Sequence, residues 1–296
     1  RLWVVGSDYS EDLRIGPEII KSHTDVYRRL RNTLRFLLGN LDGFDESERL
    51  PMAQMPELER WMLHRLWEMD ALMRKSCENF HFHSLFTELH NFCSVDLSAF
   101  YFDIRKDSLY CDRASSTTRR AARTVLDEIF NSLTAWLAPF ICFTAEEAWL
   151  ARNPGDEESV HLRLFPEISE DWRDGSLAEK WSKIRRLRRV VTGALEIERA
   201  EKRIGSSLQS APVIYADAEF TDALKSMDAG EMADLFITSG VSFAEGESLA
   251  GAFTLEDVPG VAVVPEMAQG EKCGRCWKIL DDVGSNINHP EACTRC

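Results

Sequence analysis

Several features of other protein classes are missing from this sequence. No run of eighteen apolar residues occurs among its 296 residues, so no transmembrane helix is predicted. The opening stretch, RLWVVGSDYS, lacks the charged leader and long apolar run of a signal peptide, and it lacks an initiator methionine. We interpret this start as a cut end, with residues 1–16 as the remnant of a connection to protein upstream.

The sequence also has fewer positively charged than negatively charged residues. The chain has 35 Lys and Arg against 49 Asp and Glu, which gives a formal net charge of −14. This balance argues against a protein that coats nucleic acid indiscriminately, because such binding depends on cations that neutralise phosphates. The charge is uneven, however: residues 180–203 carry nine positive and three negative side chains, whereas residues 216–259 carry ten acids and one lysine. Local basic faces are therefore compatible with the acidic average.

Catalytic motifs are absent as well. The sequence contains no glycine-rich phosphate loop, and no Ser/His/Asp or Cys/His arrangement stands out. We therefore predict no catalytic residue in this chain.

The spacing of apolar residues in the first half predicts a mainly α fold. Three- and four-residue steps predict helices over residues 17–41, 57–79, 82–97 and about 119–139. A shorter helix is expected from Thr144, which would form a capping box with Glu147. Between these helices, FYFDIRKDSLYCD (100–112) is expected to be extended, with a turn at Lys106-Asp107. The prediction for residues 17–165 is a bundle of four or five helices.

The period changes in the second half. A long basic helix is expected over residues 177–203, ending at Gly205. Beyond it, short runs of β-branched and aromatic residues predict strands within a small α/β unit spanning 166–268. These strand candidates are APVIYA (211–216), LFITS (235–239), VSFAE (241–245) and VAVVPE (261–266).

Four clustered cysteines form the last predicted module, residues 269–296. They make two Cys-x-x-Cys pairs, each of which can supply two thiolates from one tight turn, so together they predict a closed zinc site. A closed site has no position for water and is structural. The alternative, two redox disulfides, needs an oxidising compartment, whereas the other four cysteines are scattered singly, as in a cytosolic protein. The predicted zinc ligands are Cys273, Cys276, Cys293 and Cys296.

Two further metal patterns were weighed. HPEACTRC partly matches the His-x-Glu and Pro-Cys-x-x-Cys pattern of zinc deaminases, but that chemistry needs an open metal position, and four thiols would fill it. His81, His83 and His90 offer a possible second metal site. Histidines on a helix face are more often hydrogen-bonded than metal-ligating, so no second site is expected.

Four stretches resemble bacterial-type isoleucyl-tRNA synthetases, in that family's order. The closing cysteine pairs resemble the family's C-terminal zinc module. The resemblance implies a class I enzyme that uses ATP to attach isoleucine to its tRNA, and a helical anticodon-binding bundle. The four stretches are YRRLRNTLRFLLGNLDGF (27–44), VDLSAFYFDIRKDSLYCD (95–112), LAPFICFTAEEAW (137–149) and EKRIGSSLQSAPVIYAD (201–217).

The family's nucleotide-binding HIGH and KMSKS motifs do not occur in this chain. The resemblance therefore implies a non-catalytic part that binds isoleucine tRNA, with ATP bound only in a catalytic domain that is missing here. It also implies a cytoplasmic location, a monomer and no membrane association.

The resemblance suggests roles for five side chains. Arg28, Arg31 and Arg35 lie on one flank of the first long helix; taken alone they would be a solvated face, but in this family they would face tRNA phosphates. Arg275 and Trp277 would contact anticodon bases, since a zinc knuckle holds such side chains rigidly. The alternative for Trp277 is a hydrophobic plug over the zinc.

Two other functions stay open at this point. Formamidopyrimidine-DNA glycosylase, a DNA-repair enzyme, ends on a similar double cysteine pair, although it needs an N-terminal proline nucleophile and residue 1 here is Arg. A non-catalytic, zinc-tipped protein-interaction module is the third possibility.

Overall fold

The chain forms two compact units. The computed structural model describes residues 1–244, 246 and 251–296. The first unit comprises Arg1–Leu109 and Arg113–Asp174, and the second comprises Tyr110–Asp112 and Gly175–Cys296. The finer division into four domains, with boundaries after residues 16, 165 and 268, stays a prediction.

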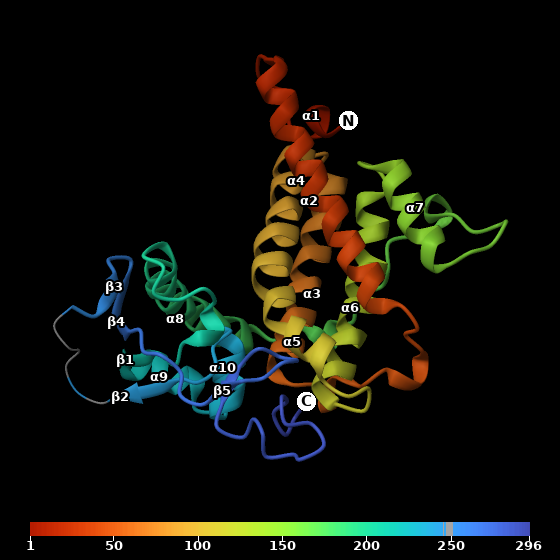
Figure 1. Ribbon diagram of the computed structural model, residues 1–296. Coiled ribbons are helices and arrows are strands. Elements are labelled where there is room, and N and C mark those ends of the chain that lie inside the picture. Colours follow the sequence, from red (N-terminus) through yellow and green to blue (C-terminus); the bar gives the residue numbers. More distant parts are fainter. Residues whose placement is uncertain (245, 247–250) are drawn as a thin grey trace. The chain divides into compact units, whose positions relative to one another are not determined.

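The first unit is a helical bundle, which confirms the predicted fold class. Helix α6 contacts both α2 and α3, and α3 also contacts α4, so the long helices lie side by side (Figure 1). The α-helices are α1 (Leu2–Val5), α2 (Pro17–Leu41), α3 (Glu57–Glu78), α4 (Phe82–Asn91), α5 (Asp103–Cys111), α6 (Thr117–Leu137) and α7 (Cys142–Arg152). Short 3-10 turns are η1 (Glu46–Glu48), η2 (Met52–Gln54), η4 (Val160–Leu162) and η5 (Glu170–Trp172).

Helix α2 has the predicted bounds, and its sequence explains both its start and its buried face. Pro17 occupies the first helical position, where a missing N–H costs nothing, and Gly16 before it is extended. Leu30, Leu34 and Leu37 recur at three- and four-residue steps and are buried. Spacing alone was therefore enough to predict this helix.

The segment expected to be extended, residues 100–112, is instead helical as far as Cys111. It continues a π-helix, η3 (Phe92–Phe102), which leads directly into α5. The Ser98 hydroxyl donates to the carbonyl of Cys93, five residues earlier, in keeping with the wider π turn. The prediction was wrong because the aromatic residues here resemble a strand, whereas the helical form places Tyr101 and Arg105 where both reach Glu59 of α3.

Helix α7 begins earlier than predicted. It starts at Cys142 with Ile141 as its N-cap, and no side-chain cap is formed, so the expected capping box at Thr144 is wrong. The Thr144 hydroxyl is instead 2.9 Å from the phenolic oxygen of Tyr27 on α2. Here a tertiary contact between two helices engages a hydroxyl that sequence reasoning assigned to local capping.

The second unit is a small sheet flanked by helices. The strands β1 (Val213–Ala216), β2 (Ser242–Ala244), β3 (Phe253–Leu255) and β4 (Val258–Val264) form a sheet in the order β2-β1-β4-β3. Strands β1 and β2 are parallel, and β4 is antiparallel to both β1 and β3. The remaining elements of this part are α8 (Gly175–Ala200), η6 (Ser207–Gln209), α9 (Ala218–Leu224) and α10 (Ala229–Phe236).

Helix α8, predicted over residues 177–203, packs against this sheet through a glycine. A Cβ atom at Gly193 would lie 2.8 Å from a ring carbon of Phe253 on β3. Only glycine therefore allows the helix and the strand to approach this closely without the ring shifting.

One strand candidate, LFITS, is wrong, whereas APVIYA and VAVVPE do contain strands. Residues Leu235 and Phe236 end helix α10, which begins with a capping box between Asp228 and Glu231. Ile237 then adopts a left-handed conformation with φ 57°. The candidate VSFAE contains β2, while its Glu245 lies outside the described residues. No helix among the described residues has the length and apolar character needed to cross a membrane.

Candidate metal centre and nucleic-acid interface

The last module is built on a short hairpin of β5 (Glu271–Lys272) and β6 (Ile279–Leu280). The first cysteine pair lies in the turn between these strands. Gly270, just before β5, has φ +108°, and a Cβ atom there would lie 2.5 Å from the backbone carbon of Leu280. Glycine is thus required at the end of the hairpin opposite its turn.

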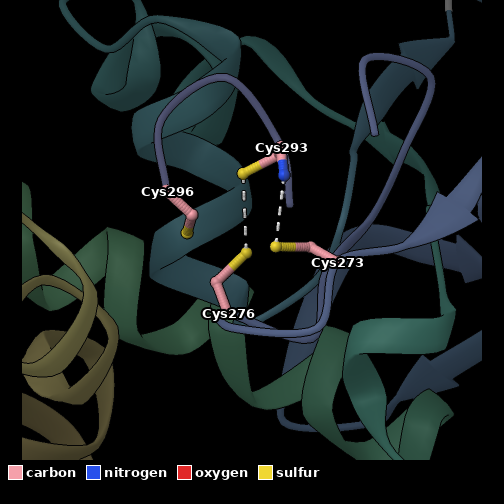
Figure 2. A group of neighbouring side chains, drawn as sticks. All are labelled: Cys273, Cys276, Cys293 and Cys296. Atoms are coloured by element: carbon pink, nitrogen blue, oxygen red, sulfur yellow. Dashed lines mark hydrogen bonds between the residues drawn. The ribbon is translucent and has the colours of Figure 1, made fainter. Parts of the chain in front are cut away.

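The four predicted ligand cysteines come together. Their sulfur atoms all lie within 4.8 Å of one another, and the Sγ atoms of Cys276 and Cys293 are 3.9 Å apart (Figure 2). Four sulfurs held tetrahedrally at ~2.3 Å from a zinc ion would be separated by ~3.8 Å. The group therefore fits a zinc ion in both donor chemistry and spacing, and Cys296 takes part although it is only half-buried.

Backbone N–H groups prepare this site for a metal. Burial acts to raise the pKa of the Cys273 thiol, but hydrogen bonds from the backbone of Cys276, Cys293 and Arg275 outweigh it and lower the pKa to about 6. Burial raises the pKa of Cys276, and it raises that of Cys296 to about 11. The Cys273 thiolate is therefore favoured before a metal binds, whereas Cys276 and Cys296 must lose protons on binding.

No pair of these cysteines forms a disulfide. All eight cysteines of the chain are free thiols in the structure. Four thiolates complete the preferred tetrahedral shell of zinc, so the site has structural rather than catalytic chemistry.

Trp277 is not a plug over this site. Its side chain is 62% exposed, and its backbone adopts φ +65°, a conformation that a bulky residue rarely takes. The partly buried apolar residues packed against the cysteine cluster are Leu280, Val283 and Ala292. The Lys272 ammonium lies 5.6 Å from the centre of the indole. The turn that carries Cys273 and Cys276, here called the first knuckle, thus presents an aromatic face to solvent with a cation beside it.

Arg275 is exposed but already has a contact. One of its guanidinium nitrogens donates to the carbonyl oxygen of Tyr110 over 3.5 Å. The Lys272 ammonium is a further cation in this knuckle, and sequence reasoning missed it. Its place directly before Cys273 was the available signal, because the turn of the hairpin brings Lys272 and Trp277 near each other.

The three predicted phosphate-contacting arginines lie in the first unit. Arg28, Arg31 and Arg35 are all exposed on α2. Arg28 forms an exposed ion pair with Asp25 at 3.1 Å, which is worth little in water. A contact of these side chains with nucleic acid stays a prediction.

The three histidines do not form a second metal site. His83 Nδ1 lies 2.6 Å from the carbonyl oxygen of Gly6, and burial lowers the pKa of His90. Across the described ranges, the four cysteines are the one group of three or more potential ligands close enough to hold a metal ion.

Two family models match this chain. Residues 59–215 match the family described as "Anticodon-binding domain of tRNA ligase". Residues 270–296 match "Zinc finger found in FPG and IleRS". The zinc-finger family by itself fits both the synthetase and the glycosylase hypotheses, whereas the first match favours the synthetase.

Similar proteins agree with the first match. The chain is 53% identical over 296 residues to an isoleucine–tRNA ligase of Brucella abortus, and 53% identical over 298 residues to one of Ruegeria pomeroyi. It is 48% identical over 297 residues to that of Caulobacter vibrioides. Each comparison covers 100% of this chain and 30% of the relative, so the chain spans less than a third of their length. By its helical bundle and by these matches, the chain belongs to the family of anticodon-binding domains of tRNA ligases.

Proposed function

We propose that this chain is the tRNA-binding part of an isoleucine–tRNA ligase, the enzyme that attaches isoleucine to its tRNA using ATP. The observation that carries the proposal is Trp277, held exposed and in a left-handed conformation directly after a four-thiol metal centre. Backbone strain of this kind persists only where the surrounding structure imposes it, and it concentrates at functional sites.

Zinc has a structural role in this proposal. Cys273, Cys276, Cys293 and Cys296 would hold one ion, which folds a module that has almost no apolar core of its own. The fold of the knuckle then fixes the direction of Trp277. A rigid indole suits stacking on an unpaired anticodon base, because it has a large face and few rotors to order.

Two groups of side chains would contact different parts of the tRNA. Arg275 and Trp277 would contact the anticodon, where bases are splayed and can be read. Arg28, Arg31 and Arg35 would contact phosphates, which position the tRNA without specifying its sequence.

The chemistry of the reaction would take place elsewhere. The chain lacks the HIGH and KMSKS motifs, so ATP would bind in a catalytic domain beyond this sequence. The eight free thiols support a reducing compartment such as the cytoplasm. We propose a monomer there, with isoleucine tRNA as the partner.

A binding experiment tests the proposal. The zinc-loaded chain is titrated with isoleucine tRNA, with the same tRNA carrying a swapped anticodon, and with duplex DNA containing a damaged base. We expect the isoleucine tRNA to bind most tightly, and Trp277→Ala to weaken it tenfold to a hundredfold at unchanged zinc content, because one aromatic–base stack is worth ~1–3 kcal/mol.

Phe143→Ala is a matched control, since Phe143 is also a highly exposed aromatic residue but lies on α7. Tight binding of the damaged DNA would support the glycosylase alternative, which the anticodon-binding match does not favour. Equal binding of both tRNAs would show that the knuckle does not read the anticodon.

A further inference from the structure

The two cysteine pairs share a feature that metal binding does not explain. Each has an arginine directly before its second cysteine, in CGRC and in CTRC. These residues are Arg275 and Arg295. Arginine is not a zinc ligand, so a contact of these two side chains must serve another purpose.

Both arginines contact one short stretch, Tyr110–Asp112, which lies where α5 ends. Arg275 donates to the carbonyl oxygen of Tyr110 over 3.5 Å. Nε of Arg295 lies 3.7 Å from Oδ1 of Asp112. Tyr110–Asp112 belongs to the same compact unit as the cysteine module, although more than 150 residues separate them along the chain.

Cys111, which lies between Tyr110 and Asp112 in the sequence, packs against the predicted metal ligands. Cys111 is buried in one cluster with Cys273, Cys276 and Cys293. Its thiol also donates to the carbonyl of Arg275 over 3.9 Å. Cys111 is thus the buried member of this cluster that comes from outside the module. Arg275 of the first cysteine pair contacts Tyr110 on one side of it, and Arg295 of the second pair contacts Asp112 on the other side.

We infer that Asp112 and Arg295 are positioning residues: together with the packing of Cys111, their ion pair anchors the zinc module to the end of α5. The anchor restricts the direction in which Arg275 and Trp277 point. This inference rests on the proposed function for its effect on RNA binding, but the anchor itself can be detected without RNA.

The charge and burial of the pair support this role. The side chain of Asp112 is 13% exposed and that of Arg295 is 35% exposed, so the pair is partly shielded from water. A shielded pair is screened less than the exposed ion pairs elsewhere on this chain. Arg199 with Glu196 on α8 is an exposed pair of the latter kind, with side chains 47% and 66% exposed.

The thiol of Cys111 is the reporter for the test. Trypsin releases it in residues 107–113, DSLYCDR, which contain no other cysteine. Zinc-loaded chain is treated with N-ethylmaleimide, and alkylation of this peptide is followed by mass spectrometry. The half-buried Cys142 on α7, in the first unit, is the internal standard.

We expect Asp112→Asn and Arg295→Gln each to accelerate alkylation of Cys111 about three- to tenfold at unchanged zinc content. The double variant should behave like either single variant, because both substitutions remove one shared interaction. Arg199→Gln, which removes the same charge in the same unit, should have no effect. Unchanged rates in both single variants, or fully additive effects, would overturn the anchor.

RNA binding separates this inference from the proposed function. If both hold, Arg295→Gln weakens binding of isoleucine tRNA although the proposed function assigns no base contact to this residue, and Trp277→Ala weakens it further. If Trp277→Ala alone has an effect, the knuckle binds RNA without needing the anchor, and the positioning role fails. If neither has an effect, the proposed function fails, and the alkylation rates still decide whether the anchor exists.

Discussion

Glu59 and Arg105 form a two-point ion pair inside the helical bundle. Nε of Arg105 lies 2.6 Å from Oε1 of Glu59, and Nη2 lies 2.7 Å from Oε2. The Glu59 side chain is fully buried, and the hydroxyl of Tyr101 also donates to it over 3.2 Å. Burial and the Glu59 carboxylate together raise the pKa of Tyr101 well above its usual value, so its proton stays in place as a donor.

The first prediction concerns this pair. Glu59→Met should destabilise the bundle by about 3–5 kcal/mol, because it leaves the buried Arg105 charge uncompensated. Glu59→Met combined with Arg105→Met should cost less than Glu59→Met alone, since no unpaired charge remains. Hydrogen exchange of α3 amides measures the local stability. A double variant that is the less stable of the two would contradict this account.

The second prediction uses the pKa of Cys273. A thiol with a pKa of about 6 is about 90% ionised at pH 7 and about 10% ionised at pH 5. Cys276 and Cys296, whose pKa values are raised, are protonated at both pH values in the metal-free protein. Zinc binding should therefore release more protons per chain at pH 5 than at pH 7, and zinc affinity should fall as the pH falls.

Calorimetry of zinc binding in buffers with different ionisation enthalpies counts these protons. Equal proton release at pH 5 and pH 7 would mean that Cys273 does not titrate between these two pH values in the metal-free protein.

The third prediction separates backbone strain from stacking at Trp277. A left-handed conformation costs any residue with a Cβ atom about 1–2 kcal/mol, and glycine avoids this cost. Trp277→Gly should therefore bind zinc about fivefold more tightly than Trp277→Ala, since folding of the module is coupled to metal binding. Competition with a chelator of known affinity measures the difference. Both variants should lose tRNA affinity alike.

The fourth prediction concerns α2. Replacing Arg28, Arg31 or Arg35 with Gln should weaken binding of different tRNAs about equally, because phosphates carry no sequence information. Each replaced phosphate contact should reduce the slope of log affinity against log salt by about one unit. If the slope stays the same in all three variants, these arginines are only a solvated face.

Local signals were sufficient for much of this structure. The leucine spacing of α2 predicted that helix, because the helix buries one face. The short runs of β-branched and aromatic residues predicted β1 and β4. The cysteine spacing predicted the metal ligands, because two tight turns bring four sulfurs together whatever the rest of the fold does.

Other features depend on contacts between residues that are distant in sequence. The aromatic π-helical segment is buried on several sides, so its sequence carries no clear period. Thr144 contacts Tyr27 rather than its own helix terminus. The ion pair of Arg295 with Asp112 could not be predicted for the same reason, because the sequence around each residue contains no signal for the other.

The π-helix has a consequence for which sequence changes the bundle can accept. If residues 92–102 wound as an α-helix of the same length, they would turn by about 100° per residue instead of the smaller angle of the wider π turn, and everything after them would be rotated. Arg105 would then turn away from Glu59, and Tyr110–Asp112 would be displaced as well. The number of residues in this segment is therefore constrained, and related sequences should keep its length constant even where an exposed residue such as Val95 varies.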